Sequence, residues 1–193
     1  MWAEARVRDL ISEHQIQERV AEIAEEINND FRGVDLLYMI PILRGGCFFG
    51  VDLAKRLEMP VRLDYIRVTT YSGTQSSGVV SMVSDIMTDI RGKPVLLVDD
   101  IIDTGFTMKW IMQYLELKYP GSVRVAALLD KPARREYEVP IDYLGFTVPN
   151  VFVAGYGLDG LDDTMANIPR IVAIEDTEEP VSVPPRRARL PVM

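Results

Sequence analysis

The chain has 193 residues but contains one cysteine, Cys47, and one histidine, His14. A single cysteine excludes a disulfide framework within the chain and a Cys-rich zinc site. With so few candidates, a catalytic Ser–His or Cys–His pair is also implausible. The scarcity of cysteine fits a reducing compartment, so we expect a cytoplasmic protein.

Long hydrophobic runs and an excess of positive charge are also missing. The longest apolar run, residues 36–43, is far shorter than the roughly 20 residues that cross a bilayer, and residues 1–15 lack the apolar core of a signal peptide. The 21 Lys and Arg residues against 29 Asp and Glu give a net charge of −8, which disfavours binding to nucleic acid or to anionic membranes. A local phosphate pocket remains compatible with this charge.

Apolar residues, at 48% of the chain, form a pattern typical of an α/β protein. Short apolar runs predict buried strands at 36–43, 61–68, 94–98, 123–129, 143–146 and 171–174, and helices are expected at 13–29, 48–57 and 106–119. Strands that are apolar throughout and alternate with helices indicate a parallel twisted sheet flanked by helices. Residues 69–81 are rich in Ser, Gly and Thr and predict a loop that could close over a site.

The segment that follows the predicted strand 94–98 has the highest concentration of candidate functional residues. Its sequence is Asp99-Asp100-Ile101-Ile102-Asp103-Thr104-Gly105-Phe106-Thr107, and it then enters a helix. Ligands of open α/β sheets bind at the carboxyl ends of the strands, and the free N–H groups of a helix N-terminus favour phosphate. Three carboxylates would repel a phosphate unless they face sugar hydroxyls, a metal ion or a developing positive charge. A ribose with a 5′-phosphate and a departing diphosphate–magnesium complex meets all these demands.

Two other interpretations of these aspartates are open. Acidic turns after strands are often solvated loops or helix caps. The same spacing also fits the aspartate-rich pattern with which isoprenoid synthases hold magnesium diphosphate. That pattern lies inside a long helix, whereas here a β-type run precedes it and Gly105 interrupts it.

Residues 95–107 resemble the phosphoribosyl diphosphate motif of type I phosphoribosyltransferases, and the wider chain resembles the hypoxanthine-guanine branch of that family. Further matches occur in family order over roughly residues 12–174: Leu43-Arg44-Gly45, Thr70-Tyr71, Leu128-Leu129-Asp130-Lys131-Pro132 and 151–159. The resemblance implies one domain, residues 1–175, whose N-terminal region and residues near 145–175 form a small hood over the carboxyl ends of the strands. Residues 176–193 are expected to be a flexible tail.

The resemblance also implies roles for individual residues. Asp103 matches the general base or acid at N7 of a purine, and the phosphoribosyl group and its 5′-phosphate would be bound by Asp99, Asp100, Asp103, Thr104, Gly105, Phe106 and Thr107. The diphosphate would be bound by Arg44 and Gly45, in a loop with a cis peptide, and the closing loop would contain Thr70 and Tyr71. The purine would be bound by Lys131, Phe152, Val153 and Asp159, and Mg²⁺ would be bound by Asp99, Asp100 and Asp159.

One departure from the family pattern concerns the diphosphate. An arginine a few residues after the Asp159 position is missing, and Met165 or Ala166 falls near its place. Arg170 is a candidate replacement.

The function implied is transfer of 5-phosphoribosyl from phosphoribosyl diphosphate to N9 of hypoxanthine or guanine, giving IMP or GMP and diphosphate, in a homodimer or homotetramer. A xanthine-preferring enzyme and a non-catalytic nucleotide sensor with the same fold are the alternatives.

Overall fold

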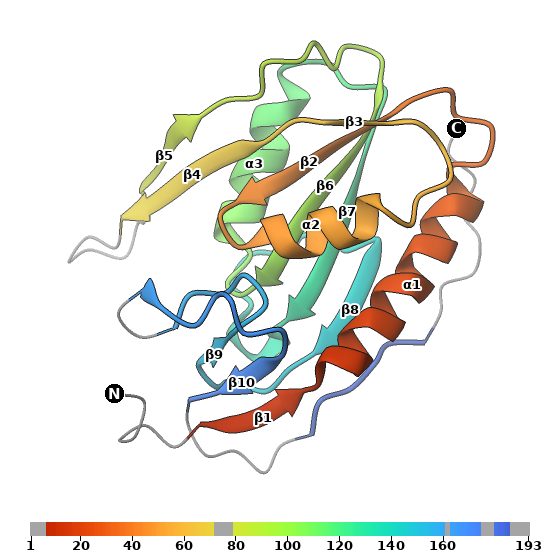
Figure 1. Cartoon of the computed structure of the whole chain (residues 1–193). Helices are drawn as coiled ribbons and strands as arrows, with labels where there is room; N and C mark the ends of the chain where they lie inside the picture. The colour runs from red at the N-terminus through yellow and green to blue at the C-terminus, as the bar shows by residue number, and fades with distance from the viewer. Residues whose placement is uncertain (1–6, 72–78, 161–162, 175–179, 186–193) are drawn as a thin grey trace.

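A central sheet organises the molecule (Figure 1). The computed structural model describes residues 7–71, 79–160, 163–174 and 180–185. The sheet has the strand order β5-β4-β2-β6-β7-β8, and β3 also pairs with β2. All pairs are parallel except β4 with β5. The strands are β2 (Leu37–Leu43), β3 (Val61–Leu63), β4 (Ile66–Tyr71), β5 (Val79–Ser84), β6 (Pro94–Ile102), β7 (Ser122–Asp130) and β8 (Tyr143–Thr147).

Helices cover both faces of this sheet (Figure 1). α1 (Glu13–Asp30) and α2 (Gly46–Ala54) pack on one face, and α3 (Phe106–Glu116) packs on the other. A capping box begins α1, where the Ser12 hydroxyl accepts from Gln15 N and the Gln15 side chain accepts from Ser12 N. A short 3-10 helix, Pro132–Arg134, follows β7.

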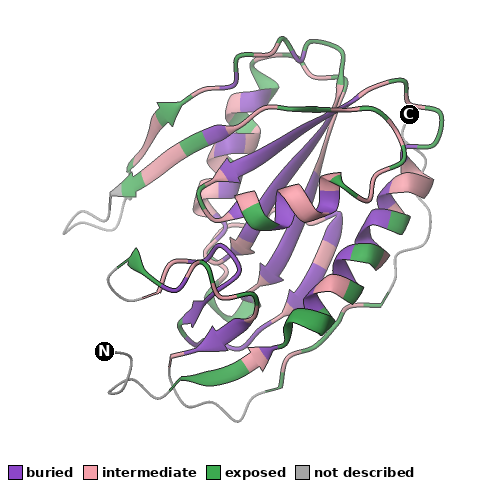
Figure 2. Ribbon diagram, viewed as in Figure 1, coloured by how far each residue is buried: buried purple, intermediate pink, exposed green. Residues whose placement is uncertain are grey.

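The central parts of the middle strands are mostly apolar because both of their faces are buried (Figure 2). In β6, Leu96 and Val98 face the core under α1 and α2, whereas Val95 and Leu97 face the core under α3. Alternation of side chains between the faces of a strand therefore places apolar residues in two cores. This confirms the predicted fold class, a mostly parallel sheet between layers of helices.

A second, smaller sheet lies at the carboxyl ends of the central strands (Figure 1). It has the order β1-β10-β9, with β1 (Arg8–Ile11), β10 (Ile171–Ala173) and β9 (Val153–Ala154) in antiparallel pairs. We call these strands and the loop between β9 and β10 the hood. The strand predicted at 171–174 thus belongs to the hood and not to the central sheet.

Several predicted boundaries were wrong, and each error has a physical reason. β6 continues past Val98 to Ile102, so Asp99 and Asp100 lie in the strand and not in a turn. The predicted strand 61–68 is divided into β3 and β4, and the predicted loop 69–81 begins and ends in strand, with residues 72–78 outside the described part. At the end of β6 and in β4 and β5, polar residues lie in a strand because their backbone groups form hydrogen bonds with a neighbouring strand. The polarity of a short segment does not predict that pairing.

Part of the predicted tail is attached to the central sheet. Ser182 and Thr147 exchange two backbone hydrogen bonds, of 2.8 and 3.0 Å, and Val181 packs against the core. The pairing extends β8 at an edge that sequence patterning does not reveal. Among the described helices, none combines the length and the apolar character needed to span a membrane.

Candidate active site

The carboxyl end of β6 brings two buried aspartates against the loop that follows β2. The peptide bond between Leu43 and Arg44 is cis, in the loop where the family resemblance implies one. A Cβ on Gly45 would lie 1.7 Å from Asp100 Oδ2. Any residue other than glycine at position 45 would therefore displace the Asp100 carboxyl group.

Asp99 and Asp100 carry an electrostatic cost in the ligand-free protein. Both are at most 9% exposed. Burial, followed by repulsion from Asp100, raises the pKa of Asp99 well above its ordinary value. Burial also raises the pKa of Asp100, to which the charge of Asp159 contributes. The pair therefore tends to keep a proton, and a cation or a hydrogen-bond donor would relieve the excess of negative charge.

The turn between β6 and α3 has the geometry of an anion site. Gly105 has φ of 85° and caps α3, and a Cβ there would lie 2.2 Å from the carbonyl oxygen of Tyr137. Glycine is thus required both for the left-handed backbone and for space. Thr104 Oγ1 accepts from Phe106 N at 3.3 Å, whereas the Phe106 ring lies 5.3 Å from the Tyr137 ring. The Phe106 N–H thus has an acceptor within the turn, and the Phe106 ring lies beside the Tyr137 ring.

A polar cavity of about 260 Å³ lies at this turn. We call it the carboxylate cavity. Its lining comes from the end of β6, the turn and start of α3, the ends of β2 and β4, and the loop after β2, and includes Asp99, Asp100, Asp103, Thr104, Gly105, Thr107, Gly45 and Thr70. The hydroxyl oxygens of Thr70 and Thr107 lie 3.3 Å apart, so β4 closes one side.

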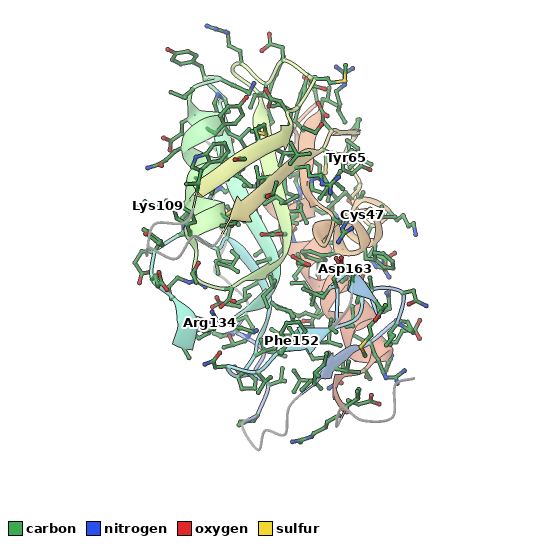
Figure 3. The ribbon with its side chains drawn as sticks, turned by 90° about the vertical axis from the view of Figure 1, so that its left-hand side faces the viewer. Cys47, Tyr65, Lys109, Arg134, Phe152 and Asp163 are labelled. Atoms are coloured by element: carbon green, nitrogen blue, oxygen red, sulfur yellow. The ribbon has the colours of Figure 1, made fainter. Side chains whose placement is uncertain are left out.

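A second cavity, of about 480 Å³, lies under the hood. We call it the lysine cavity, and it is lined by Ile101, Asp103, Lys131, Arg134, Asn150, Val151, Phe152, Val153, Leu158 and Asp159. Lys131 is 6% exposed, whereas Phe152 is 43% exposed. Figure 3 shows Phe152 near Arg134 at the same end of the molecule. An aromatic face and a buried ammonium group in one cavity suit a flat, carbonyl-bearing ring.

The two cavities adjoin, because Ile101 and Asp103 line both of them. One Asp103 oxygen, Oδ1, is buried and lies 3.1 Å from Arg134 Nε, without a hydrogen bond of regular geometry. Asp103 therefore stands where a ligand in one cavity would meet a ligand in the other. A carboxylate at that junction can exchange a proton with either ligand.

Two arginines that the sequence analysis did not select support this junction. Arg134 contacts Asp103, and Arg135 donates to the carbonyl oxygens of Asp103 and Ile102, at 3.2 and 3.3 Å, while also bonding the Asp130 carboxylate. Both lie within three residues of the end of the Lys131 motif, but the sequence of a charged pair does not show which residues it contacts. These hydrogen bonds and the ion pair of Arg134 with Asp103 link the segment after β7 to the carboxyl end of β6.

The two arginines considered for diphosphate binding, Arg44 and Arg170, lie in different surroundings. Arg44 forms an ion pair with Asp159 and lies 3.8 Å from Asp163, beside the hood. Arg170 pairs with Asp9 at 2.6 Å and lines neither cavity, so nothing supports it as the replacement for the missing arginine. Met165 is 6% exposed and packs in a small core of the hood.

The metal candidates do not form a site by themselves. Within residues 7–71, 79–160, 163–174 and 180–185, no group of three or more His, Cys, Asp or Glu side chains could hold a metal ion. Asp99 and Asp100 lie in the carboxylate cavity and Asp159 in the lysine cavity. Any Mg²⁺ here would need oxygen ligands from a bound substrate as well. The side chain of Tyr71 lies outside the described part of the structure.

A comparison with known families agrees with this geometry. A model of the phosphoribosyl transferase domain matches residues 8–160. The chain belongs to the phosphoribosyltransferase family, which confirms the resemblance based on residues 95–107.

Within that family the chain is similar to hypoxanthine-guanine phosphoribosyltransferases. The enzyme of Mycobacterium avium is 43% identical over 157 residues, which are 78% of this chain and 77% of that one. The enzyme of Aquifex aeolicus is 38% identical over 172 residues, or 89% and 96% of the two chains. The structure of hypoxanthine phosphoribosyltransferase from Trypanosoma cruzi in complex with the product IMP has a TM-score of 0.82 at 36% identity, with coverage of 90% and 96%.

Proposed function

We propose that the protein is a purine salvage enzyme that transfers 5-phosphoribosyl from phosphoribosyl diphosphate to N9 of hypoxanthine or guanine. The observation that carries the proposal is the junction of the two cavities at Ile101 and Asp103. A sugar phosphate in the carboxylate cavity and a purine in the lysine cavity would meet there. In the reaction the bond from C1′ of the ribose to the diphosphate oxygen breaks, and the bond from C1′ to N9 forms.

The chain's own groups suit a transition state with positive charge on the ribose. Asp99 and Asp100 lie in the cavity that would hold the sugar, and carboxylates there favour an oxocarbenium-like ring. Asp103 would exchange the purine proton at N7. Residues 103–107 would bind the 5′-phosphate, largely through backbone N–H groups at the start of α3. Closure of the segment around Tyr71 would exclude water, which otherwise hydrolyses the activated sugar.

Magnesium is the cofactor we propose. The buried pair Asp99 and Asp100, with its raised pKa values and its proximity to Asp159, has the hard oxygen ligands and the surplus of negative charge that suit Mg²⁺. When bound with the diphosphate, the ion would offset the charge that develops on this leaving group.

Lys131 and Phe152 would select and orient the base. An ammonium group donates hydrogen bonds but accepts none, so Lys131 fits the 6-oxo group of hypoxanthine, guanine or xanthine and not the 6-amino group of adenine. Phe152 offers an exposed ring for stacking, and backbone groups near Val153 could contact the purine edge. Arg44 and Gly45, in the loop with the cis bond, would bind the diphosphate.

The decisive assay is turnover of phosphoribosyl diphosphate with hypoxanthine, guanine, xanthine and adenine, in the presence of Mg²⁺. We expect IMP and GMP as the main products and almost no AMP. Preference for xanthine would favour the alternative enzyme, and absence of turnover with any base would favour a nucleotide sensor. We further propose a cytoplasmic location, which the single cysteine supports, and a homodimer or homotetramer, which the family resemblance implies.

A further inference from the structure

The hood meets α2 through a strained loop whose role is not explained by direct contact with either cavity. Gly155, Tyr156 and Gly157 have φ of 98°, 50° and 99°, three left-handed residues in succession. The left-handed conformation is unfavourable for tyrosine and persists where the surroundings hold it. Tyr156 is 4% exposed and lines neither cavity.

The Tyr156 side chain is fastened to the helix that begins at the diphosphate loop. Its hydroxyl donates to Asp52 Oδ2 at 2.8 Å, and its ring packs edge-on against Phe48, 5.9 Å between centroids. Both partners belong to α2, which starts one residue after Gly45. Gln17 of α1 also donates to Asp52 Oδ2, at 2.9 Å, so the carboxylate is held from two sides.

The Asp52 carboxylate is ionised and accepts hydrogen bonds from several side chains. Burial raises its pKa, but hydrogen bonds from Gln17, Tyr156 and Lys55 outweigh burial and lower the pKa overall. A hydroxyl that donates to this half-buried carboxylate forms a charge-assisted bond, which is stronger than a neutral one.

The backbone of the loop also contacts the diphosphate loop directly. A Cβ on Gly157 would lie 2.5 Å from the carbonyl oxygen of Gly45 and 3.3 Å from the Phe48 ring. One residue beyond Gly157, Leu158 and then Asp159 line the lysine cavity, and Asp159 pairs with Arg44. A shift of this loop would thus move the wall of the lysine cavity and the diphosphate loop relative to each other.

We propose that Tyr156 is a positioning residue for catalysis, whose bond to Asp52 fixes the purine-binding wall of the hood against the diphosphate loop. The inference rests on the proposed function, because it assigns the lysine cavity to the purine. It requires that loss of the hydroxyl weakens purine binding more than it slows the chemical step, since the hydrogen bonds and the ring contact of Tyr156 are with Asp52, Ile168 and Phe48 and not with the 99–107 segment.

The test is Tyr156→Phe, with Tyr143→Phe as its matched control. Tyr143 is also buried and its hydroxyl also bonds an aspartate, Asp30, at 3.0 Å, but it joins β8 to α1 and lines neither cavity. Both variants lose one partly buried Tyr–Asp hydrogen bond, so both should lower Tm to a similar extent.

For Tyr156→Phe we expect a KM for hypoxanthine raised on the order of tenfold, a smaller rise in the KM for phosphoribosyl diphosphate, and kcat within about twofold of the parent. Tyr143→Phe should leave all three constants within about twofold. Asp52→Asn keeps an amide oxygen that can accept from Tyr156, so it should raise the hypoxanthine KM less, and it should add little to Tyr156→Phe.

Equal hypoxanthine KM values in the two tyrosine variants would overturn the proposal and leave the proposed function intact. A fall in kcat with unchanged KM would overturn it as well. If the parent transfers phosphoribosyl to no purine, the proposed function fails, and this inference fails with it.

Discussion

The carboxylate cavity and the lysine cavity are built in different ways. Most residues that line the first lie between 99 and 108, on one strand end, one turn and one helix start. The lining of the second comes from four separate segments, at 101–103, 131–134, 150–153 and 158–159. The first cavity therefore depends on local geometry, in particular on Gly105, whereas the second depends on how the hood is held over the sheet.

The largest effect is expected at the junction of the two cavities. Asp103→Asn keeps the shape of the side chain but removes its ability to take up a proton. Since general acid–base catalysis contributes about 10²–10⁴-fold, kcat should fall by that order while the KM for phosphoribosyl diphosphate changes little. The exposed Asp35→Asn is the control and should behave as the parent. Equal turnover of Asp103→Asn and the parent would refute the assignment.

A change in the lysine cavity should alter selectivity. In Lys131→Gln an amide that can both donate and accept replaces three donors, so the ratio of kcat/KM for hypoxanthine to that for adenine should fall by about 10–10². Lys109→Gln removes an exposed ammonium that lies over the Tyr137 ring, and it should leave the ratio unchanged. If Lys131→Gln also leaves it unchanged, base identity is recognised elsewhere, with the backbone near Val153 as the next candidate.

A change in the carboxylate cavity should stabilise the ligand-free protein. The pKa of Asp99 is raised in the folded state, so between its unfolded value, near 3.8, and its folded value the folded protein binds more protons. Stability is therefore lost as pH rises through that window. Asp99→Asn keeps an oxygen that can accept from Asp100 N and should raise Tm at pH 7 by a few °C, with the gain shrinking toward pH 4.

Asp142→Asn provides the contrast to this variant. Asp142 is equally buried but is paired with Arg124 at 2.9 Å, so its replacement should lower Tm at pH 7. Thermal scans of both variants at pH 4 and pH 7 measure the difference. A lower Tm for Asp99→Asn at pH 7 would show that the charge of Asp99, beside Asp100, does not destabilise the folded protein.

The smallest effect is expected outside both cavities. Truncation after Ile174 removes the pairing of Ser182 with Thr147 and the contact of Val181 with the core, so Tm should fall by a few °C while kcat/KM stays within about twofold. Ser182→Pro, which cannot donate to Thr147, should reproduce part of the loss. A large loss of activity in the truncated protein would mean that this segment has a role in catalysis.

Prediction from sequence succeeded where the structure depends on neighbouring residues. The strand from residue 94 and Gly105 at the start of α3 could be recognised because hydrophobic patterning and helix capping act over a few residues, although Asp99 and Asp100 proved to lie in the strand and not in a turn. Lys131, Phe152 and Asp159 were selected through family resemblance, since each alone looks like a solvated charge or a core residue. Arg134 and Arg135 were missed because their partners, Asp103 and Asp130, are identified by contacts and not by spacing.

The α/β class, the first helix and the chemical character of the 99–107 segment therefore follow from hydrophobic periodicity and local residue chemistry, which are encoded residue by residue. The tertiary structure alone decided that Asp103 lies at the junction of two cavities, that Arg44 meets Asp159, and that Tyr156 joins the hood to α2. Those contacts join residues 30 to more than 100 positions apart, and they form when packing of the sheet, helices and hood brings these segments together.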